Sequence, residues 1–160
     1  MILPGQTIRE LCSGAYGQRP MLDPFCERGV ANGMSYGLSV AGYDVRIAQD
    51  VTLMPGQFSL ASTLEHFVMP NDVLAKVADK STWARRGLAV QNTIIEPGWR
   101  GYLTLEITNH GHGVIRVEAG TPIAQIIFHR LEAPAERLYS GKYQDQEFGA
   151  VAARFEGDAQ

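Results

Sequence analysis

A basic, hydroxyl-rich segment is the first place in this sequence where side chains could act on an anionic ligand. Residues 80–87 read KSTWARRG and follow the apolar stretch Val73 to Val77. Serine and threonine hydroxyls, adjacent backbone amides and the bidentate fork of arginine can surround phosphate oxygens. The glycine spacing of a Walker A loop is absent. Composition alone favours a solvated basic turn, with a phosphate-binding turn as the alternative.

Two glutamates stand where a carboxylate could do acid–base or ligand-binding work. Alternation along residues 102–109 (YLTLEITN) puts Leu103 and Leu105 on one face of a predicted strand, with Thr104 and Glu106 on the other. A mid-strand glutamate is either on a wet face or lines a pocket. Glu96 ends an apolar strand at a turn, where it either meets a ligand hydroxyl or caps the turn. From the residues alone, a surface carboxylate and a turn residue are the favoured interpretations.

The histidines do not indicate a zinc site. Nucleobase deaminases that use zinc carry a His-x-Glu pair and a Pro-Cys-x-x-Cys pair, and neither occurs here. The two cysteines, Cys12 and Cys26, precede all the histidines and lie far from them in sequence. His110 and His112 are predicted to lie in a polar hairpin loop. We therefore expect no zinc in this protein.

Short strands must position these side chains. Thr7 and Glu10 form a capping box that predicts a short N-terminal helix ending near Gly14, and residues 15–37 are predicted to be irregular. From residue 38 the hydrophobic period is two. The predicted strands cover residues 38–47 (bent at Gly42), 57–63, 73–77, 88–95, 102–108, 114–117 and 123–129. This even spacing predicts an all-β sandwich, jelly roll or small barrel.

Length, charge and hydropathy limit the classes of function. The chain has 160 residues, 45% of them hydrophobic, which predicts one domain over residues 1–160. A net charge of −3 gives no global field for nucleic acid, and no apolar run is long enough to span a bilayer. No signal peptide is evident, and two cysteines suit a reducing compartment. We expect a cytoplasmic protein that binds neither nucleic acid nor membrane.

Taken in order, these segments resemble the dCTP deaminase branch of the dUTPase-like superfamily. The resemblance lies in residues 41–46 (AGYDVR), 55–65 (PGQFSLASTLE), 80–88 (KSTWARRGL), 96–109 (EPGWRGYLTLEITN), 120–125 (GTPIAQ) and 141–146 (GKYQDQ). Each motif alone is weak, whereas the ordered series covers most of the chain. The resemblance implies a distorted jelly roll or β-barrel of the dUTPase-like type with a short N-terminal helix. It also implies a homotrimer with active sites between subunits.

The implied reaction is hydrolytic deamination of dCTP to dUTP and ammonia without zinc. Glu106 would be the general base and proton shuttle for water attacking C4. Ser81 and Arg85 would position that water and stabilise the charge of the tetrahedral intermediate. These three are the implied catalytic residues. The implied substrate-binding residues are Lys80, Ser81, Thr82, Trp83, Ala84, Arg85, Glu96, Thr104, Leu105, Gln125, Tyr139, Lys142 and Gln146.

Each group of binding residues has its own implied part of the nucleotide. Residues 80–85, with Tyr139, Lys142 and Gln146, would hold the triphosphate, and Mg²⁺ would bridge the phosphate oxygens. Glu96 would accept the sugar 3′-hydroxyl. Thr104, Leu105 and Gln125 would line the sugar and base region. The polar residues 140–160 are either a loose tail or a segment that closes over this site.

Departures from the family pattern leave alternatives open. Lys80 replaces the usual arginine, Glu96 replaces aspartate, and residues 89–96 are fewer than in typical deaminases, which bears on base recognition and on feedback by dTTP. A dUTPase is the nearest rival, although trimeric dUTPases typically have an apolar residue at the position of Glu106 and a glycine-rich tail. A bifunctional deaminase that forms dUMP is a further alternative. A catalytically silent jelly-roll binding protein is the alternative from another class.

Overall fold

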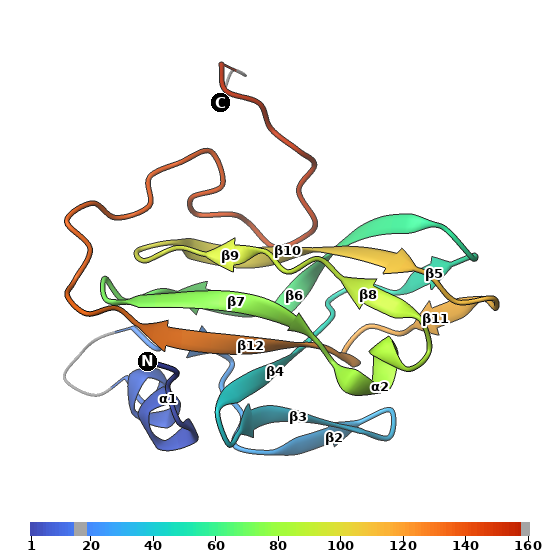
Figure 1. Cartoon of the computed structure of the whole chain (residues 1–160), viewed down its shortest axis with the longest axis horizontal. Coiled ribbons are helices and arrows are strands. Elements are labelled where there is room, and N and C mark those ends of the chain that lie inside the picture. The colour runs from blue at the N-terminus through green and yellow to red at the C-terminus, as the bar shows by residue number, and fades with distance from the viewer. Residues whose placement is uncertain (15–18, 158–160) are drawn as a thin grey trace.

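The computed structural model describes residues 1–14 and 19–157 of the chain. The helices among them are α1 (Gly5–Cys12) and α2 (Ser81–Ala84). The strands are β1 (Leu22–Asp23), β2 (Gly29–Ala31), β3 (Met34–Ser39), β4 (Gly42–Arg46), β5 (Val51–Leu53), β6 (Phe58–Val68), β7 (Val73–Asp79), β8 (Leu88–Val90), β9 (Ile94–Ile95), β10 (Arg100–Asn109), β11 (Ile115–Val117) and β12 (Pro122–Arg130). The predicted all-β class with a short N-terminal helix is confirmed (Figure 1).

The strands form two curled sheets and a small ribbon. The larger sheet has the order β2-β3-β4-β12-β7-β9, the second has the order β1-β6-β10-β8, and β5 pairs with β11 in the ribbon. Every strand pair described is antiparallel. This arrangement places β10, which carries Glu106, between the long strand β6 and the short strand β8.

Alternating apolar residues from both sheets build the core. On β10 the side chains of Leu105 and Ile107 are fully buried, as the alternation predicted, and Phe128 of β12 is fully buried as well. Tyr43 of β4 is also inaccessible to solvent, and its hydroxyl accepts the backbone N–H of Cys26 at 2.9 Å. The polar face of β10 therefore points away from the core, toward the C-terminal end of the chain.

The N-terminal helix exists, but its predicted capping box is wrong. The helix begins at Gly5 with Pro4 at the N-cap, and no side chain caps it. Thr7 lies inside the first turn and cannot act as the N-cap. The fixed φ of proline provides an extended residue that starts the helix three positions earlier. The buried side chains of Ile8 and Cys12 then hold the helix against the body of the protein.

The prediction of irregular structure for residues 15–37 is wrong over β1, β2 and the first part of β3, and residues 15–18 lie outside the described residues. β2 and β3 form a hairpin in which Asn32 has φ 48° and Gly33 has φ 74°. Asn-Gly is the strongest sequence signal for such a turn, because both central residues need positive φ. The signal was present in the sequence.

Residues 38–47 form part of a hairpin, not one strand bent at Gly42. β3 ends at Ser39, Val40 and Ala41 make the turn, and β4 begins at Gly42. The apolar Val40 suggested a continuous strand, but its side chain is 91% exposed. The predicted strand 88–95 is likewise two strands, β8 and β9, separated by residues 91–93. The basic segment 80–87 contains the single-turn helix α2 where we predicted a turn.

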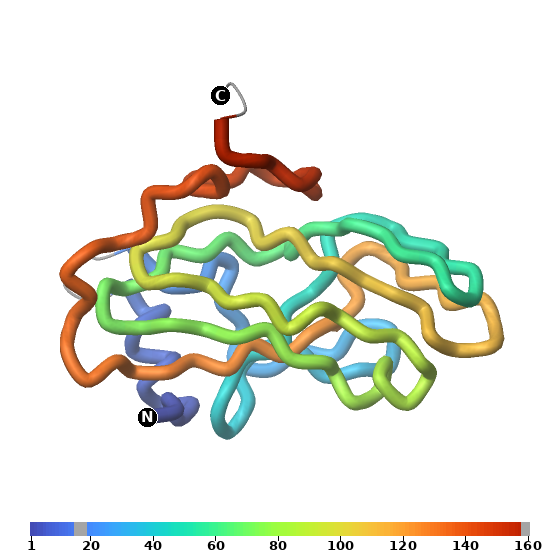
Figure 2. The backbone as a smooth tube through the Cα atoms, turned by 45° about the horizontal axis from the view of Figure 1, so that its top comes forward, coloured from blue at the N-terminus to red at the C-terminus, as the bar shows by residue number. Residues whose placement is uncertain are grey.

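The chain after β12 returns over the β9–β10 side of the molecule. Residues 139–157, which we call the C-terminal tail, contain no helix or strand and run along the side opposite α1 (Figure 2). Gln146 makes a parallel bridge to Gly101 of β10. Within the described ranges, no helix has the length and apolar character needed to cross a membrane.

Candidate active site

A cavity of about 250 Å³ lies between β10, the segment 93–99 and the C-terminal tail. Five of the predicted substrate-binding and catalytic residues line it, namely Glu96, Thr104, Glu106, Tyr139 and Gln146. The other lining residues are Thr93, Ile94, Ile95, Trp99, Leu103, Tyr143 and Val151. The structure thus brings residues from positions 93 to 151 together around one small volume.

Glu106 is held in this cavity by the two strands that flank β10. Its Cα is opposite Leu60 of β6, and its carbonyl oxygen accepts the N–H of Gln91 at 3.0 Å. The side chain is half-buried, and its Oε2 atom is buried without a hydrogen-bond partner. Burial raises the pKa of the Glu106 carboxyl. The interpretation of Glu106 as a surface carboxylate is therefore wrong.

Such a carboxylate is suited to proton transfer. Loss of hydration disfavours the charged form, so the group binds a proton more readily than an exposed glutamate does. With no arginine, lysine or backbone amide on Oε2, its lone pairs remain available to a water molecule or a ligand. A buried carboxylate with a raised pKa in a cavity is a recognised signature of general acid–base sites.

Gln146 connects the C-terminal tail to β10 beside Glu106. Its amide nitrogen donates to Thr104 Oγ1 at 2.6 Å and to the Tyr102 carbonyl at 2.7 Å. In return, the Tyr102 N–H donates to the Gln146 carbonyl at 3.0 Å. This close approach of the tail requires a glycine on β10, because a Cβ at Gly101 would lie 2.7 Å from the backbone nitrogen of Gln146. The tail is thus seated on β10 by backbone and side-chain bonds.

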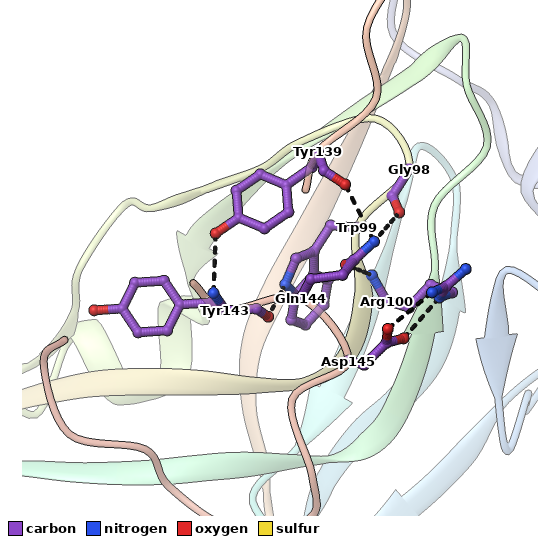
Figure 3. Close-up of polar contacts among 7 residues, drawn as sticks. All are labelled: Gly98, Trp99, Arg100, Tyr139, Tyr143, Gln144 and Asp145. Carbon is purple, nitrogen blue, oxygen red and sulfur yellow. Dashed lines mark hydrogen bonds and ion pairs between the residues drawn. The ribbon is translucent and has the colours of Figure 1, made fainter. Parts of the chain in front are cut away.

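The tail is anchored a second time, at the turn before β10 (Figure 3). Gln144 accepts the Arg100 N–H at 2.9 Å and donates to the Gly98 carbonyl at 3.0 Å. The buried Trp99 donates its indole N–H to the Tyr143 carbonyl at 2.6 Å. Arg100 also forms a bidentate ion pair with Asp145, at 2.7 and 2.8 Å. This cluster fixes the register in which Gln146 reaches Thr104.

Glu96 and Tyr139 lie on the outer part of the cavity. Glu96 is exposed, and its carbonyl closes the turn by accepting the Trp99 N–H at 3.1 Å. Tyr139 accepts the Tyr143 N–H through its hydroxyl at 3.2 Å. The Glu96 carboxylate is not used in the turn-closing bond, so it stays available to a ligand.

The segment 80–85 does not reach this cavity within one chain. Ser81, Thr82, Ala84 and Arg85 are exposed on and after α2, and none of them lines the Glu106 cavity. Trp83 is buried and donates its indole N–H to the Pro122 carbonyl at 2.7 Å, so its side chain anchors the helix.

Lys80 is not the exposed cation that the sequence suggested. Its side chain is buried, and the ammonium forms an ion pair with Asp44 at 2.9 Å. A lysine taken out of water needs such a partner. In the described structure Lys80 therefore fixes the start of α2 to β4.

Three further predicted binding residues also lie outside the cavity. The Leu105 side chain is fully buried in the core, on the opposite face of β10 from Glu106. Gln125 of β12 donates to Ser39 Oγ at 3.3 Å. The Lys142 ammonium pairs with Glu156 at 3.3 Å. The Leu105 side chain cannot contact a ligand there, which corrects that part of the prediction.

Seven lining residues were not among the site residues predicted from the sequence, namely Thr93, Ile94, Ile95, Trp99, Leu103, Tyr143 and Val151. Trp99 and Tyr143 stand inside the motifs 96–109 and 141–146, so a signal for them was present. Thr93 lies in a stretch predicted as one continuous strand, and nothing in its neighbours marks it as special. Among residues 1–14 and 19–157, no three His, Cys, Asp or Glu side chains gather closely enough to hold a metal ion.

Comparison with known proteins places these features in context. A family model described as dCTP deaminase-like matches residues 25–131. A dCTP deaminase from Campylobacter fetus is 36% identical over 81% of this chain and 88% of its own length. A dCTP deaminase from Acidobacterium capsulatum is 36% identical over 79% of this chain and 87% of its own length.

Solved structures with a similar fold include dUTPases. The native dUTPase of EIAV aligns with a TM-score of 0.56 and 21% identity, over 76% of this chain and 98% of that chain. The dUTPase of Staphylococcus bacteriophage 80alpha aligns with a TM-score of 0.55 and 18% identity, over 74% of this chain and 92% of that chain. These alignments confirm the predicted dUTPase-like jelly roll.

Proposed function

The chain belongs to the dCTP deaminase-like family, and we propose that it hydrolyses dCTP to dUTP and ammonia with Glu106 as the general base. The observation that carries this proposal is the buried, unpartnered Oε2 of Glu106 in a cavity closed by the tail. If the Glu106 carboxylate served only the stability of the fold, its Oε2 atom would have a hydrogen-bond partner, since a buried polar atom without a partner costs free energy.

Each step of the proposed reaction involves a proton transfer to or from a named atom. Glu106 takes a proton from water as the oxygen attacks C4, and it passes this proton to the pyrimidine N3 as the tetrahedral intermediate forms. Glu106 then takes the proton of the C4 hydroxyl and delivers it to the amino group. The C4–N4 bond breaks, the amino group leaves as ammonia, and the oxygen becomes the 4-oxo group of dUTP. One water is consumed and one ammonia is released.

The groups that stabilise the intermediate come from a second chain in this proposal. Negative charge develops on the oxygen at C4 as the hydroxyl of the intermediate loses its proton, and hydrogen-bond donors aimed at that oxygen lower the barrier. Ser81 and Arg85 are exposed and absent from the cavity of their own chain. We therefore place Ser81 and Arg85 of one subunit against Glu106 of its neighbour in a homotrimer.

The triphosphate would lie between α2 of one chain and the tail of another. Thr82, the backbone of residues 80–85 and the Arg85 guanidinium would bind phosphate oxygens from one side, with Tyr139 and Lys142 from the other. Lys142 must leave its exposed partner Glu156 to do so, which costs little because such surface pairs are weak. Lys80 would contribute only indirectly to phosphate binding, because its ion pair with Asp44 holds the start of α2 in place.

Mg²⁺ fits this arrangement as a companion of the substrate. It prefers phosphate and water oxygens and needs few protein ligands, in keeping with the lack of a metal-binding cluster among the described residues. When bound, it would neutralise part of the triphosphate charge. Zinc has no role in the proposal, because Glu106 supplies the proton transfer that a zinc-bound hydroxide would otherwise provide.

Product analysis tests the proposed function. The protein is incubated with dCTP and with dUTP in separate reactions, and ammonia, dUTP, dUMP and pyrophosphate are resolved. A deaminase yields ammonia and dUTP from dCTP and leaves dUTP intact. Formation of dUMP and pyrophosphate from both substrates would identify the bifunctional alternative. Pyrophosphate from dUTP without ammonia from dCTP would identify a dUTPase, and no product would support the silent binding protein.

A further inference from the structure

Two buried side-chain oxygens in the described residues have no hydrogen-bond partner, and the residues that carry them line the same cavity. They are Glu106 Oε2 and Thr93 Oγ1. Leaving a buried hydroxyl without a partner costs free energy, and a valine of almost the same shape would avoid that cost. Glu106 has a role in the proposed reaction, whereas Thr93 has none so far.

The position of Thr93 is set by its backbone. In the connection between β8 and β9 its N–H donates to the Gln91 carbonyl at 2.9 Å, and its carbonyl accepts the Val77 N–H at 3.0 Å. Gln91 in turn donates to the Glu106 carbonyl at 3.0 Å. The Thr93 hydroxyl is therefore carried on a segment bonded directly to the strand of the general base. No structural hydrogen bond to the hydroxyl itself takes part in this positioning.

The neighbourhood of Glu106 defines what the hydroxyl would meet. If Glu106 delivers protons around C4, the part of the ligand nearest to it is the N3–C4 edge of the pyrimidine. That edge carries a 4-amino donor and an N3 acceptor in cytosine. A threonine hydroxyl can accept one hydrogen bond and donate another, so it matches either atom.

We propose that Thr93 is a specificity-determining residue whose hydroxyl hydrogen-bonds the N3–C4 edge of the pyrimidine substrate. This inference rests on the proposed function, since it takes the ligand to be a cytosine nucleotide. The substrate then supplies the partner that Thr93 lacks in the free protein. The unpaired hydroxyl lowers the stability of the free enzyme and improves recognition of the base.

Thr93→Val and Thr93→Ser separate this role from a structural one. Thr93→Val should lower kcat/KM for dCTP roughly tenfold, as expected for one lost hydrogen bond to the ligand. Its melting temperature in the absence of nucleotide should be equal to or above that of the wild type, because an unpaired buried hydroxyl is removed. Thr93→Ser should retain most of the kcat/KM. The matched control is Thr52→Val, at an exposed position on β5, which should change neither quantity.

Two outcomes would overturn the role of Thr93. One is a Thr93→Val enzyme with wild-type kcat/KM, and the other is a lowered melting temperature without nucleotide, which would show that the hydroxyl is structural. If the wild type releases no ammonia from dCTP, the proposed function fails separately. Calorimetric affinity for dUTP then still tests the hydroxyl as a ligand contact, and equal affinities of wild type and Thr93→Val would refute it.

Discussion

Glu65 and Glu106 lie on neighbouring strands and have opposite environments. Glu65 of β6 is fully buried and accepts both the backbone N–H and the Nε–H of Arg46, at 2.9 and 2.8 Å. Glu106 of β10 has a buried oxygen with no partner and opens onto a cavity. The first carboxylate is therefore committed to the fold, and the second is available for chemistry. This difference leads to opposite effects of the same substitution.

Glu106→Gln should abolish most turnover while it stabilises the protein. Loss of the base should reduce kcat by roughly 10²–10⁴-fold with little change in nucleotide affinity. The melting temperature should rise, because a poorly solvated carboxylate is replaced by a neutral amide. Glu65→Gln should lower it, since Arg46 loses its charged partner. Steady-state kinetics, calorimetry with dCTP and thermal unfolding measure these effects, and near-wild-type turnover by Glu106→Gln would refute the mechanism.

The pH dependence of activity follows from the same carboxyl. Burial raises the pKa of Glu106, and the ionised form is the base, so kcat/KM should fall as the pH drops through this raised pKa. The acid-side midpoint should lie above that of an ordinary glutamate. A midpoint at or below the ordinary value would contradict the assignment.

The stability of the wild type should also depend on the ionisation of Glu106. Unlike the activity, its contribution to stability should fall as the pH rises. The folded state binds this proton more tightly than the unfolded chain does, so the wild type should be less stable than Glu106→Gln above the raised pKa. That difference should vanish below the unfolded pKa. Thermal unfolding of both proteins across the pH range measures it.

Sequence patterns located individual residues more easily than their partners. Alternation along β10 correctly put Glu106 on the face opposite Leu103 and Leu105. It could not show that Oε2 would be buried and unpaired, because this depends on the tail and on residues 91–93. The prediction that Lys80 is an exposed cation was wrong for the same reason. Asp44 is distant in the sequence, and it pairs with Lys80 only after β4 and β7 flank β12 in one sheet.

At the scale of elements, the β9–β10 turn and the tail act as one unit. Trp99, Arg100 and Gln144 connect them through the hydrogen bonds of Figure 3, and Gln146 then bonds to Thr104 within the cavity. The tail thus completes the wall that encloses Glu106. We expect it to be less stable than the sheets, because it is held by hydrogen bonds and contains no strand or helix.

Gln144→Ala should loosen the tail without unfolding the sheets. The change removes the acceptor for the Arg100 N–H and the donor to the Gly98 and Tyr139 carbonyls. We expect KM for dCTP to rise about tenfold with a smaller change in kcat. Hydrogen exchange should accelerate at the amides of Arg100 and Tyr102. Gln6→Ala, at an exposed position of α1, is the control. Unchanged KM and unchanged exchange would show that this anchor has no part in substrate binding.

Element prediction succeeded where the period was regular and failed where turns decided the structure. β6, β7, β10 and β12 lie where alternation predicted strands, although their ends extend further. The β2–β3 hairpin was missed because glycine, proline and turn formers dominate its surroundings. For the tail, the sequence allowed both a loose and a closing segment, since polar residues without periodicity specify no element. Its docking depends on Gly101, whose missing side chain admits Gln146.

At the scale of the whole molecule, one chain does not bring its proposed catalytic residues together in one cavity. Glu106 lies in the tail-closed cavity, and Ser81 and Arg85 lie on and just after the exposed face of α2, outside it. The proposed homotrimer unites them, and it explains why exposed residues on α2 would carry chemistry. The single domain predicted for residues 1–160 then acts as one third of the assembly.

Mixed trimers test this sharing directly. Glu106→Gln and Ser81→Ala are each expected to be nearly inactive alone. After the two are unfolded and refolded together at equal amounts, about one quarter of the sites should combine an intact Glu106 with an intact Ser81 of the neighbouring subunit. Recovery of about that fraction of wild-type activity supports the shared site, and light scattering should give about three times 17.5 kDa. No recovery in a confirmed mixed trimer would place both residues in one subunit's site.

Metal dependence is a second property that the proposed enzyme should have. Activity should survive zinc-selective chelators and fall when Mg²⁺ is removed, because the metal accompanies the triphosphate. Elemental analysis of the purified protein provides the check. Stoichiometric zinc, with activity lost on its removal and restored on its return, would contradict the proposed chemistry.

The fate of the oxygen of water tests the central claim most directly. Wild-type protein is incubated with dCTP in H₂¹⁸O, and the nucleotide product and the phosphates are analysed by mass spectrometry. Attack of water at C4 with Glu106 as the base predicts dUTP with one ¹⁸O at the 4-oxo position of uracil and no label in the phosphates, with almost no labelled product from Glu106→Gln. Label in phosphate alone, or uracil labelled by Glu106→Gln at the wild-type rate, would contradict it.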